Sequence, residues 1–414
     1  MIAYGALGLP LAMAALPLYV QLPAYFAGTL GVPLATVGIV FIAARLADTL
    51  PDPWLGRWAD HLASTGRLRW AMVLAAAGLA LAFAALWRPP TGVGQVALWL
   101  GAMLALASVC HTFLQVSHLG WGARLGDAAD RIRAATWREG LGLVGVVAAS
   151  ALPVALLSGG GRMPRAYPAL FAGLLVVALV LLLRRAPAWR GAQASNPVGV
   201  RAAAARPAVR ALLPAYFVNA LAVAVPATLV MFFVQDRLGA PRVAGLFLVL
   251  YFVAGALGMP VWSRVARRVG PTRAWRAGML SAAAVFVWAG LLGPGDVVAF
   301  GAVCVLSGLL LGADLALPPV LLAQRIPPDD APGAYYGVWM LLGKLAIAGA
   351  GATLPVLAAL GYVPGHGAPG AEGTGWLAFA YAGVPCALKL AAAALLPAPP
   401  PEPNLTGASP CLPR

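Results

Sequence analysis

The sequence has few charged residues and almost no lysine. Only 10% of its 414 residues are charged, against about 25% in an ordinary soluble domain, while 61% are hydrophobic. This composition excludes a soluble globular protein and predicts an integral membrane protein. Only two of its 28 basic residues are lysines, and alanine is abundant. That bias is typical of a GC-rich bacterial genome, so we expect a bacterial inner (plasma) membrane.

The sequence also lacks the patterns on which enzymes and metal centres depend. Its four cysteines are scattered, without metal or redox spacing. It has no zinc-protease motif, no serine nucleophile elbow and no phosphate-binding loop. Its net charge of +15 comes without alternation of basic and aromatic residues. We therefore predict no enzyme activity, no cofactor and no nucleic-acid partner.

What the sequence does have is a series of long apolar runs. Each is long enough to cross a hydrocarbon layer about 30 Å thick. The sequence thus predicts an all-α protein in the lipid bilayer, which we expect to be a monomer. The twelve predicted spans are 4–28, 32–56, 70–88, 94–120, 135–157, 167–186, 208–235, 241–263, 274–292, 297–323, 333–359 and 375–396.

Arginines gather in alternate loops between these spans. If the N-terminus is cytoplasmic, most arginines fall in cytoplasmic loops and only a few in the opposite ones. This asymmetry follows the positive-inside rule and predicts that both termini are cytoplasmic. The first span is too long for a signal-peptide core, so we expect it to be retained.

The chain divides into two similar halves. The segment 184–210 is the longest polar connection and separates six spans from six. We predict bundles at 1–186 and 208–396, a linker at 187–207 and a disordered cytoplasmic tail at 397–414. Four residue pairs recur 202 positions apart, namely Gly56 and Gly258, Asp127 and Asp329, Trp137 and Trp339, and Pro153 and Pro355.

A duplicated six-helix unit around a central cavity is the architecture of major facilitator transporters. The loop after the second span resembles the signature loop of that superfamily. Gly56, Asp60 and Arg67 are its matching residues. The resemblance implies a major facilitator fold with a cytoplasmic gating loop here.

The second span holds a cluster of charges. Arg45, Asp48 and Asp52 are spaced three and four residues apart, so they share one helix face. Two carboxylates about 5 Å apart repel by roughly 3 kcal/mol at an effective dielectric near 20. A proton, a metal cation or a basic side chain relieves that repulsion, which predicts a site for H⁺ or Na⁺. The alternative is a structural pair of Arg45 and Asp48, with Asp52 among the lipid headgroups.

Two lysines lie in later spans. Lys344 admits a functional interpretation or a structural, snorkelling one. Lys389 lies near the end of the last span, and we predict that it snorkels toward the cytoplasmic interface.

The motif Arg45-x-x-Asp48-x-x-x-Asp52-Pro53-x-x-Gly56 resembles that of the glycoside-pentoside-hexuronide:cation symporters, the family of the melibiose permeases. The block "GKLAIAGAGATLPVLAALGYVPG" resembles the family's eleventh helix. The resemblance implies that Asp48 and Asp52 bind the coupling cation. If that cation is Na⁺, the two aspartates would be its ligands. It further implies that Lys344 balances their charge and Arg45 supports them. The implied function is cation-coupled symport of a sugar or glycoside by alternating access.

The sugar site of that family matches less well. Its carboxylates on helices one and four are missing here, where Ala12 and the segment 111–113 stand. Arg138 alone resembles the family's arginine on helix five. Whether His111 or Asp314 replaces the missing carboxylates stays open. The predicted cavity residues, each also consistent with helix packing, are Tyr19, His111, Gln115, Arg138, Asn219, Asp314 and Trp339.

Two other functions stay open. One is a cation-coupled carrier of lysophospholipids or other amphiphiles, which the missing sugar carboxylates favour. The other is a receptor or scaffold that does not transport. Retention of ionisable residues inside membrane spans argues against a scaffold, because buried charge is costly.

Overall fold

The computed structural model describes residues 1–16, 22, 25–26, 40, 44, 51–90, 93–157, 165–186, 198–362 and 372–397. These residues form helices joined by short turns, and this part of the chain contains no β-strand. Helices are the expected form, because a backbone in lipid must satisfy its own hydrogen bonds.

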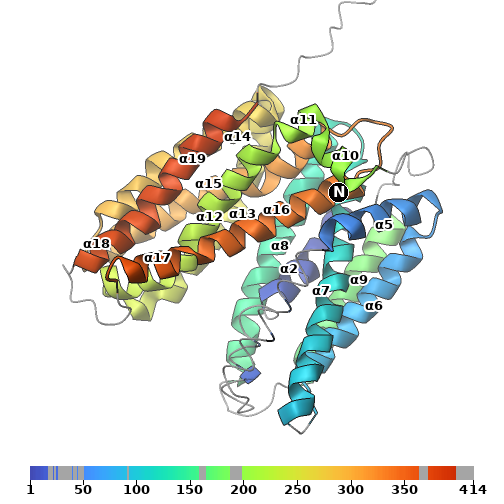
Figure 1. The fold of residues 1–414 in the computed structure, drawn as a ribbon, viewed down its shortest axis with the longest axis horizontal. Coiled ribbons are helices and arrows are strands. Elements are labelled where there is room, and N and C mark those ends of the chain that lie inside the picture. Colours follow the sequence, from blue (N-terminus) through green and yellow to red (C-terminus); the bar gives the residue numbers. More distant parts are fainter. Residues whose placement is uncertain are drawn as a thin grey trace, which may run out of the picture.

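The helices form two groups that lie side by side (Figure 1). We call them the N-terminal and C-terminal bundles. The N-terminal bundle contains α1 (Ile2–Gly5), α2 (Gly8–Leu16), α5 (Asp52–Ser64), α6 (Leu68–Leu86), α7 (Val93–Ala123), α8 (Ala128–Leu157) and α9 (Ala166–Arg185). The C-terminal bundle contains α12 (Leu213–Phe232), η3 (Phe233–Arg237), η4 (Pro241–Val243), α13 (Ala244–Val269), α14 (Pro271–Phe286), η5 (Val287–Leu291), α15 (Val297–Ala323), α16 (Gly333–Gly351), α17 (Thr353–Ala359), α18 (Glu372–Ala378), η6 (Phe379–Gly383) and α19 (Val384–Leu395).

Two short helices, α10 (Val200–Ala205) and α11 (Pro207–Arg210), lie between the bundles in sequence. They sit at the end of the molecule where the bundles meet, which we call the linker end, and the described helices of the two bundles diverge toward the opposite end (Figure 1). The predicted limits of the halves and of the tail stay predictions.

Eight of the described helical segments are long and apolar enough to span a membrane. They are Leu68–Leu86, Gln95–Ala123, Ala166–Arg185, Pro207–Arg237, Pro241–Val269, Pro271–Leu291, Val297–Ala323 and Gly373–Leu395. Most of the second predicted span lies outside the described residues. The fifth predicted span corresponds to α8, and the eleventh to α16 and α17.

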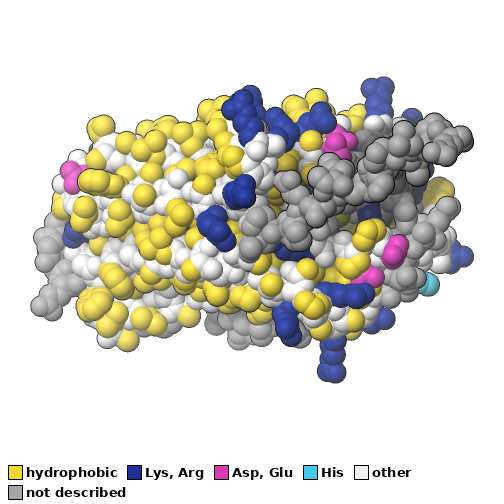
Figure 2. Space-filling model, turned by 90° about the horizontal axis from the view of Figure 1, so that it is seen from above, with side chains coloured by type: hydrophobic (Ala, Val, Ile, Leu, Met, Phe, Trp, Pro, Cys, Tyr) yellow, Lys and Arg dark blue, Asp and Glu magenta, His cyan; other side chains and the backbone are white. Residues whose placement is uncertain are grey.

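Large apolar side chains cover the outside of these helices. Trp70, Leu98 and Val298 are 74%, 79% and 87% exposed. Figure 2, viewed from above Figure 1, shows apolar side chains over the left flank and basic ones toward the middle and right. So much exposed apolar surface is expected of a multi-pass protein whose flanks contact lipid.

The backbones of the two bundles come into contact at the linker end, where α5 crosses α16. A Cβ atom at Gly56 would collide with the carbonyl oxygen of Gly333. One at Gly337 would lie 2.6 Å from the carbonyl oxygen of Asp52 and from Cα of Pro53. Glycine at these positions lets the two backbones touch.

Candidate functional site

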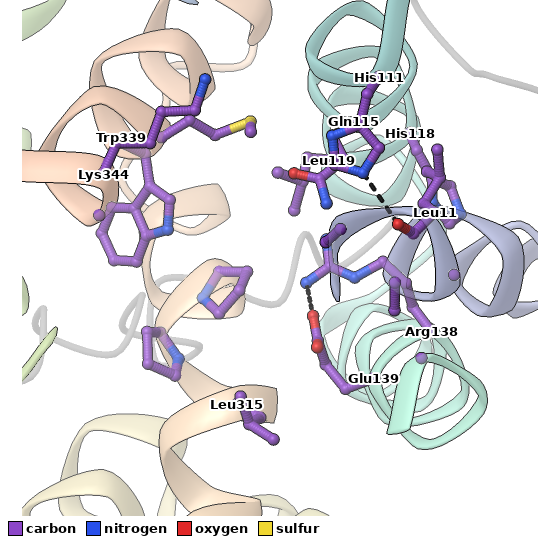
Figure 3. A pocket seen from close by; sticks show the side chains of 18 of the residues that line it. Leu11, His111, Gln115, His118, Leu119, Arg138, Glu139, Leu315, Trp339 and Lys344 are labelled. Atoms are coloured by element: carbon purple, nitrogen blue, oxygen red, sulfur yellow. Dashed lines mark hydrogen bonds and ion pairs between the residues drawn. The ribbon is translucent and has the colours of Figure 1, made fainter. Parts of the chain in front are cut away.

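A cavity of about 550 Å³ lies between the two bundles. Its size is in the range of about 300 to 1,000 Å³ that is usual for small-molecule sites. Figure 3 shows His111, Gln115, Arg138 and Glu139 on one side and Lys344, Trp339 and Leu315 on the other. The polar and aromatic lining residues are His111, Gln115, His118, Arg138, Glu139, Tyr216, Asp314, Trp339 and Lys344.

Lys344 on α16 reaches across from the C-terminal bundle into the N-terminal one. Its Nζ lies 2.9 Å from Oδ1 of Asp52 and 3.2 Å from Oγ1 of Thr112 on α7. Asp52 is completely buried, whereas the Lys344 side chain is 21% exposed and lines the cavity. The ammonium therefore neutralises a carboxylate that would otherwise be costly inside the membrane.

The local sequence explains why a carboxylate sits at this point. Pro51 caps the N-terminus of α5, and Asp52 is the first residue of the helix. The amides of Trp54 and Leu55 donate to the Pro51 carbonyl at 3.0 and 2.9 Å. A carboxylate at a helix N-terminus is favoured by the helix dipole.

Three predicted site residues lie outside the described residues: Tyr19, Arg45 and Asp48. The predicted pairing of Asp48 with Asp52 therefore stays a prediction. Of the cation-site residues, the structure places Asp52 and Lys344 together, although they are nearly three hundred positions apart in sequence.

Arg138 lies in the cavity wall and pairs with the adjacent Glu139. Their side chains are 11% and 26% exposed, and both point from α8 into the cavity (Figure 3). The turn that presents Arg138 packs tightly on α2, because a Cβ at Gly8 would collide with the Arg138 carbonyl. Glu139 is a cavity carboxylate that the sequence comparison with sugar carriers did not reveal.

The two histidines of α7 tie this helix to the N-terminus of the chain. His111 Nε2 lies 2.9 Å from the carbonyl oxygen of Leu11, and His118 Nε2 lies 2.8 Å from that of Tyr4. Because a carbonyl only accepts, each Nε2 must carry the proton. The Tyr4 hydroxyl donates in return to the His118 carbonyl at 2.8 Å. Nε2 of His111 is thus engaged in a hydrogen bond between α7 and α2, although the side chain also lines the cavity.

Gln115 and Trp339 also line the cavity, and their role in binding a solute stays a prediction. The Trp339 indole stacks on Tyr216, with ring centroids 3.3 Å apart and an interplanar angle of 16°. Both rings line the cavity.

Asp314 lines the cavity, but it has a partner that the sequence did not indicate. It forms an ion pair with Lys389 of α19. The prediction that Lys389 snorkels is wrong, because this side chain is buried and bonded within the bundle. Asn219 lies behind Asp314, donates to it at 3.1 Å, and is not among the lining residues.

The predicted gating residues lie at the linker end. Asp60 accepts hydrogen bonds from the amides of Gly333 and Ala334 at 2.7 and 3.1 Å, and so caps α16 from the other bundle. Burial raises the pKa of Asp60 to about 6, although those amides and nearby Arg124 act to lower it. Gly56 lies at the helix crossing, whereas Arg67 precedes α6 in an exposed position.

A second set of contacts closes the linker end, and sequence reasoning missed it. Buried Asp330 pairs with Arg206 at 2.9 Å and accepts from the Tyr335 hydroxyl at 2.6 Å. Arg124, at the end of α7, donates to the carbonyls of Pro328 and Asp330. Arginine is common in the loops of this sequence, so no sequence feature distinguished Arg124 and Arg206 from the other loop arginines.

Comparison with known proteins gives one family and several related folds. The family model described as MFS/sugar transport protein matches residues 1–398. The inner membrane symporter YicJ of Escherichia coli is 26% identical over 163 residues, or 38% of this chain. The matched part is 35% of YicJ, so the chain matches about a third of the length of this relative.

Among solved structures, a bacterial homologue of the iron transporter ferroportin, in an outward-facing state, has a TM-score of 0.71 at 18% identity. The alignment covers 96% of this chain and 98% of that one. The Escherichia coli fucose:proton symporter FucP has a TM-score of 0.66 at 14% identity, with 94% and 96% covered. At such identities the likeness shows a shared fold.

Proposed function

Because the chain belongs to the MFS/sugar transport protein family, we propose that it is a secondary active carrier that couples entry of a sugar-like solute to Na⁺ or H⁺. The observation that supports this most is the bond between Lys344 and Asp52 across the two bundles. The N-terminal bundle supplies this carboxylate and the C-terminal bundle neutralises it. Binding of a cation at this carboxylate can therefore affect both bundles.

The ammonium of Lys344 occupies the position where a coupling cation would meet Asp52. Na⁺ prefers oxygen ligands, and Asp52 Oδ1 and Thr112 Oγ1 both lie next to this nitrogen. A cation that binds these oxygens displaces Lys344 toward the cavity. Cation binding then changes the solute site, which is what coupling requires.

The charges of the cavity favour an uncharged polar solute. Arg138 pairs with Glu139, Lys344 with Asp52, and Asp314 with Lys389, so each charged lining residue already has a partner of opposite sign. An ionic solute would have to break one of these pairs. Hydroxyl groups can instead add hydrogen bonds to the carboxylates, to Gln115 and to the Trp339 indole.

We further propose that the linker end is cytoplasmic, as the arginine distribution predicts, and that this conformation opens outward. The contacts of Asp60 and Asp330 close the linker end, while the bundles diverge at the other end (Figure 1). The similarity to an outward-facing structure supports this orientation.

An amphiphile carrier is the second candidate. Between the charged pairs the cavity wall is apolar, with Leu11, Leu119, Leu315, Met340 and Ile347. An acyl chain would contact these side chains, whereas a sugar would use mainly the polar and aromatic ones.

A thermal-unfolding screen of the purified protein distinguishes these candidates. Mono- and disaccharides, methyl glycosides and lysophosphatidylcholine are each tested in sodium chloride and in choline chloride. We expect a sugar to raise the unfolding midpoint and sodium or lower pH to enlarge that shift. Stabilisation by the lysolipid alone would favour the amphiphile carrier, and no shift with any compound would contradict both.

A further inference from the structure

Two carboxylates in the cavity wall differ in how open they are to the cavity. Among the described residues, Glu139 of α8 and Asp314 of α15 are the acidic side chains that line it. The Glu139 side chain is 26% exposed, whereas that of Asp314 is 7% exposed. Glu139 points from α8 into the cavity (Figure 3). Its carboxylate is therefore the better placed of the two to meet a solute.

The remaining hydrogen-bonding capacity of the two carboxylates differs as well. Both oxygens of Asp314 already accept hydrogen bonds, one from an ammonium and the other from an amide and an indole N–H of the same bundle. In Glu139, Oε1 accepts from the Arg138 guanidinium. An ionised carboxylate has about four lone-pair positions. Glu139 can therefore accept further hydrogen bonds while it stays paired with Arg138.

We propose that Glu139 determines the specificity of this carrier, because its carboxylate accepts hydrogen bonds from hydroxyl groups of an uncharged sugar. This inference rests on the proposed transport of a sugar-like solute and adds the group that recognises it. Hydroxyl groups donate to a carboxylate in charge-assisted hydrogen bonds, which are shorter and stronger than neutral ones. A sugar that lacks the matching hydroxyl would leave this acceptor without its partner.

Arg138 is the positioning residue for this carboxylate. Its side chain is 11% exposed, and its guanidinium pairs with Glu139. The guanidinium also interacts with the buried Tyr4 of α1. Arg138 thus lies between a buried tyrosine and Glu139, which fixes the direction in which the carboxylate faces.

The space in front of Glu139 extends to the other bundle. Tyr216 of α12 lines the cavity and interacts electrostatically with both Glu139 and Arg138. On α8, Gly142 follows Glu139 by about one turn and also lines the cavity. Ala12 of α2 lies beside it, with its Cβ 3.5 Å from the place that a Cβ at Gly142 would occupy. Two small residues next to Glu139 leave room for a solute between the bundles.

A structural role for Glu139 would be to neutralise Arg138 and nothing more. The two residues are neighbours on α8, so the pair between them does not join two helices. A buried ion pair gives little stability beyond that of apolar residues of similar volume, and ionisable residues within a membrane span are costly. Retention of a carboxylate that faces the cavity is better explained by contact with a solute.

The test is isothermal titration calorimetry of the purified full-length protein with methyl glycosides in sodium chloride. The methyl glycoside that binds most tightly is compared with its own monodeoxy analogues. For the wild type, we expect at least one analogue to bind about tenfold or more weakly than the parent glycoside, because a hydrogen bond to a charged group is lost.

The variant Glu139→Gln keeps the size of the side chain and an oxygen for Arg138, but it removes the charge and one acceptor. We expect the parent glycoside to bind to it about tenfold or more weakly than to the wild type. Removal of the matching hydroxyl should then cost little further affinity, because the two changes remove the same interaction. If Glu139→Gln does not fold, Glu139→Asp carries the same comparison, since it keeps the charge but withdraws it by one methylene group.

Asp130→Asn is the matched control. Asp130 also lies on α8 and pairs with Arg133 at 2.7 Å, but it does not line the cavity. This variant should bind the parent glycoside and its analogues as the wild type does. Unchanged affinity in Glu139→Gln, or an equal loss for the parent and for every analogue, would overturn the proposal and leave sugar transport standing. A wild-type protein that binds no glycoside would contradict the proposed function as well.

Discussion

The carboxylate of Asp60 makes closure of the linker end sensitive to pH. In the closed arrangement burial raises its pKa to about 6 from an ordinary value of 3.8. When the linker end opens, Asp60 meets water and its pKa returns toward the ordinary value. The closed arrangement therefore binds more protons between these two values, and its relative stability is greatest below them and falls as pH rises through about 6.

We therefore expect acidification from pH 7 to pH 5 to increase the closed fraction. Spin labels at positions 57 and 267, which are exposed on α5 and α13, would report the distance between the bundles. The native cysteines would be replaced first. Asp60→Asn should remove the pH dependence, because an amide does not titrate in this range. A closed fraction that rises with pH would contradict this account.

At the scale of elements, the crossing of α5 and α16 depends on glycine. Gly337→Ala would place a methyl group 2.6 Å from backbone atoms of Asp52 and Pro53, so the helices must move apart. We expect a loss of about 1 to 3 kcal/mol in the stability of this packing, measured as a lower unfolding midpoint. The labels at positions 57 and 267 should also report more open molecules.

Gly351→Ala is the control for this change. Gly351 lies on the same helix, and a Cβ there would have open space around it. Alanine is the better helix former by about 1 kcal/mol, so this variant should be at least as stable as the wild type. Equal effects of the two substitutions would show that α16 itself, and not its crossing with α5, is sensitive.

At the scale of the whole molecule, the sequence predicted the fold well. The comparisons confirm the all-helical major facilitator fold, and the family match confirms a membrane transporter and not an enzyme. Hydropathy predicted twelve spans, because lipid demands long apolar helices, and eight of the described helical segments are long and apolar enough to span a membrane.

Pairings between distant residues were harder to predict. The family motif linked Lys344 to Asp52, but no motif linked Lys389 to Asp314, so Lys389 was assigned to the interface. Glu139 was not predicted, because the family resemblance points only to its neighbour Arg138. Which charged residues meet depends on how the helices pack in three dimensions. The residue pattern along a single helix does not contain that information. The roles of the predicted site residues stay predictions.

The central claim is that a cation which binds at Asp52 and displaces Lys344 drives accumulation of solute. The most direct measurement is uptake of the best stabilising solute into liposomes that contain the purified protein, under a Na⁺ gradient, a proton gradient or neither. We expect accumulation under one gradient, and its loss in Asp52→Asn while solute counterflow persists. Accumulation without any gradient, or unchanged accumulation in Asp52→Asn, would contradict the account.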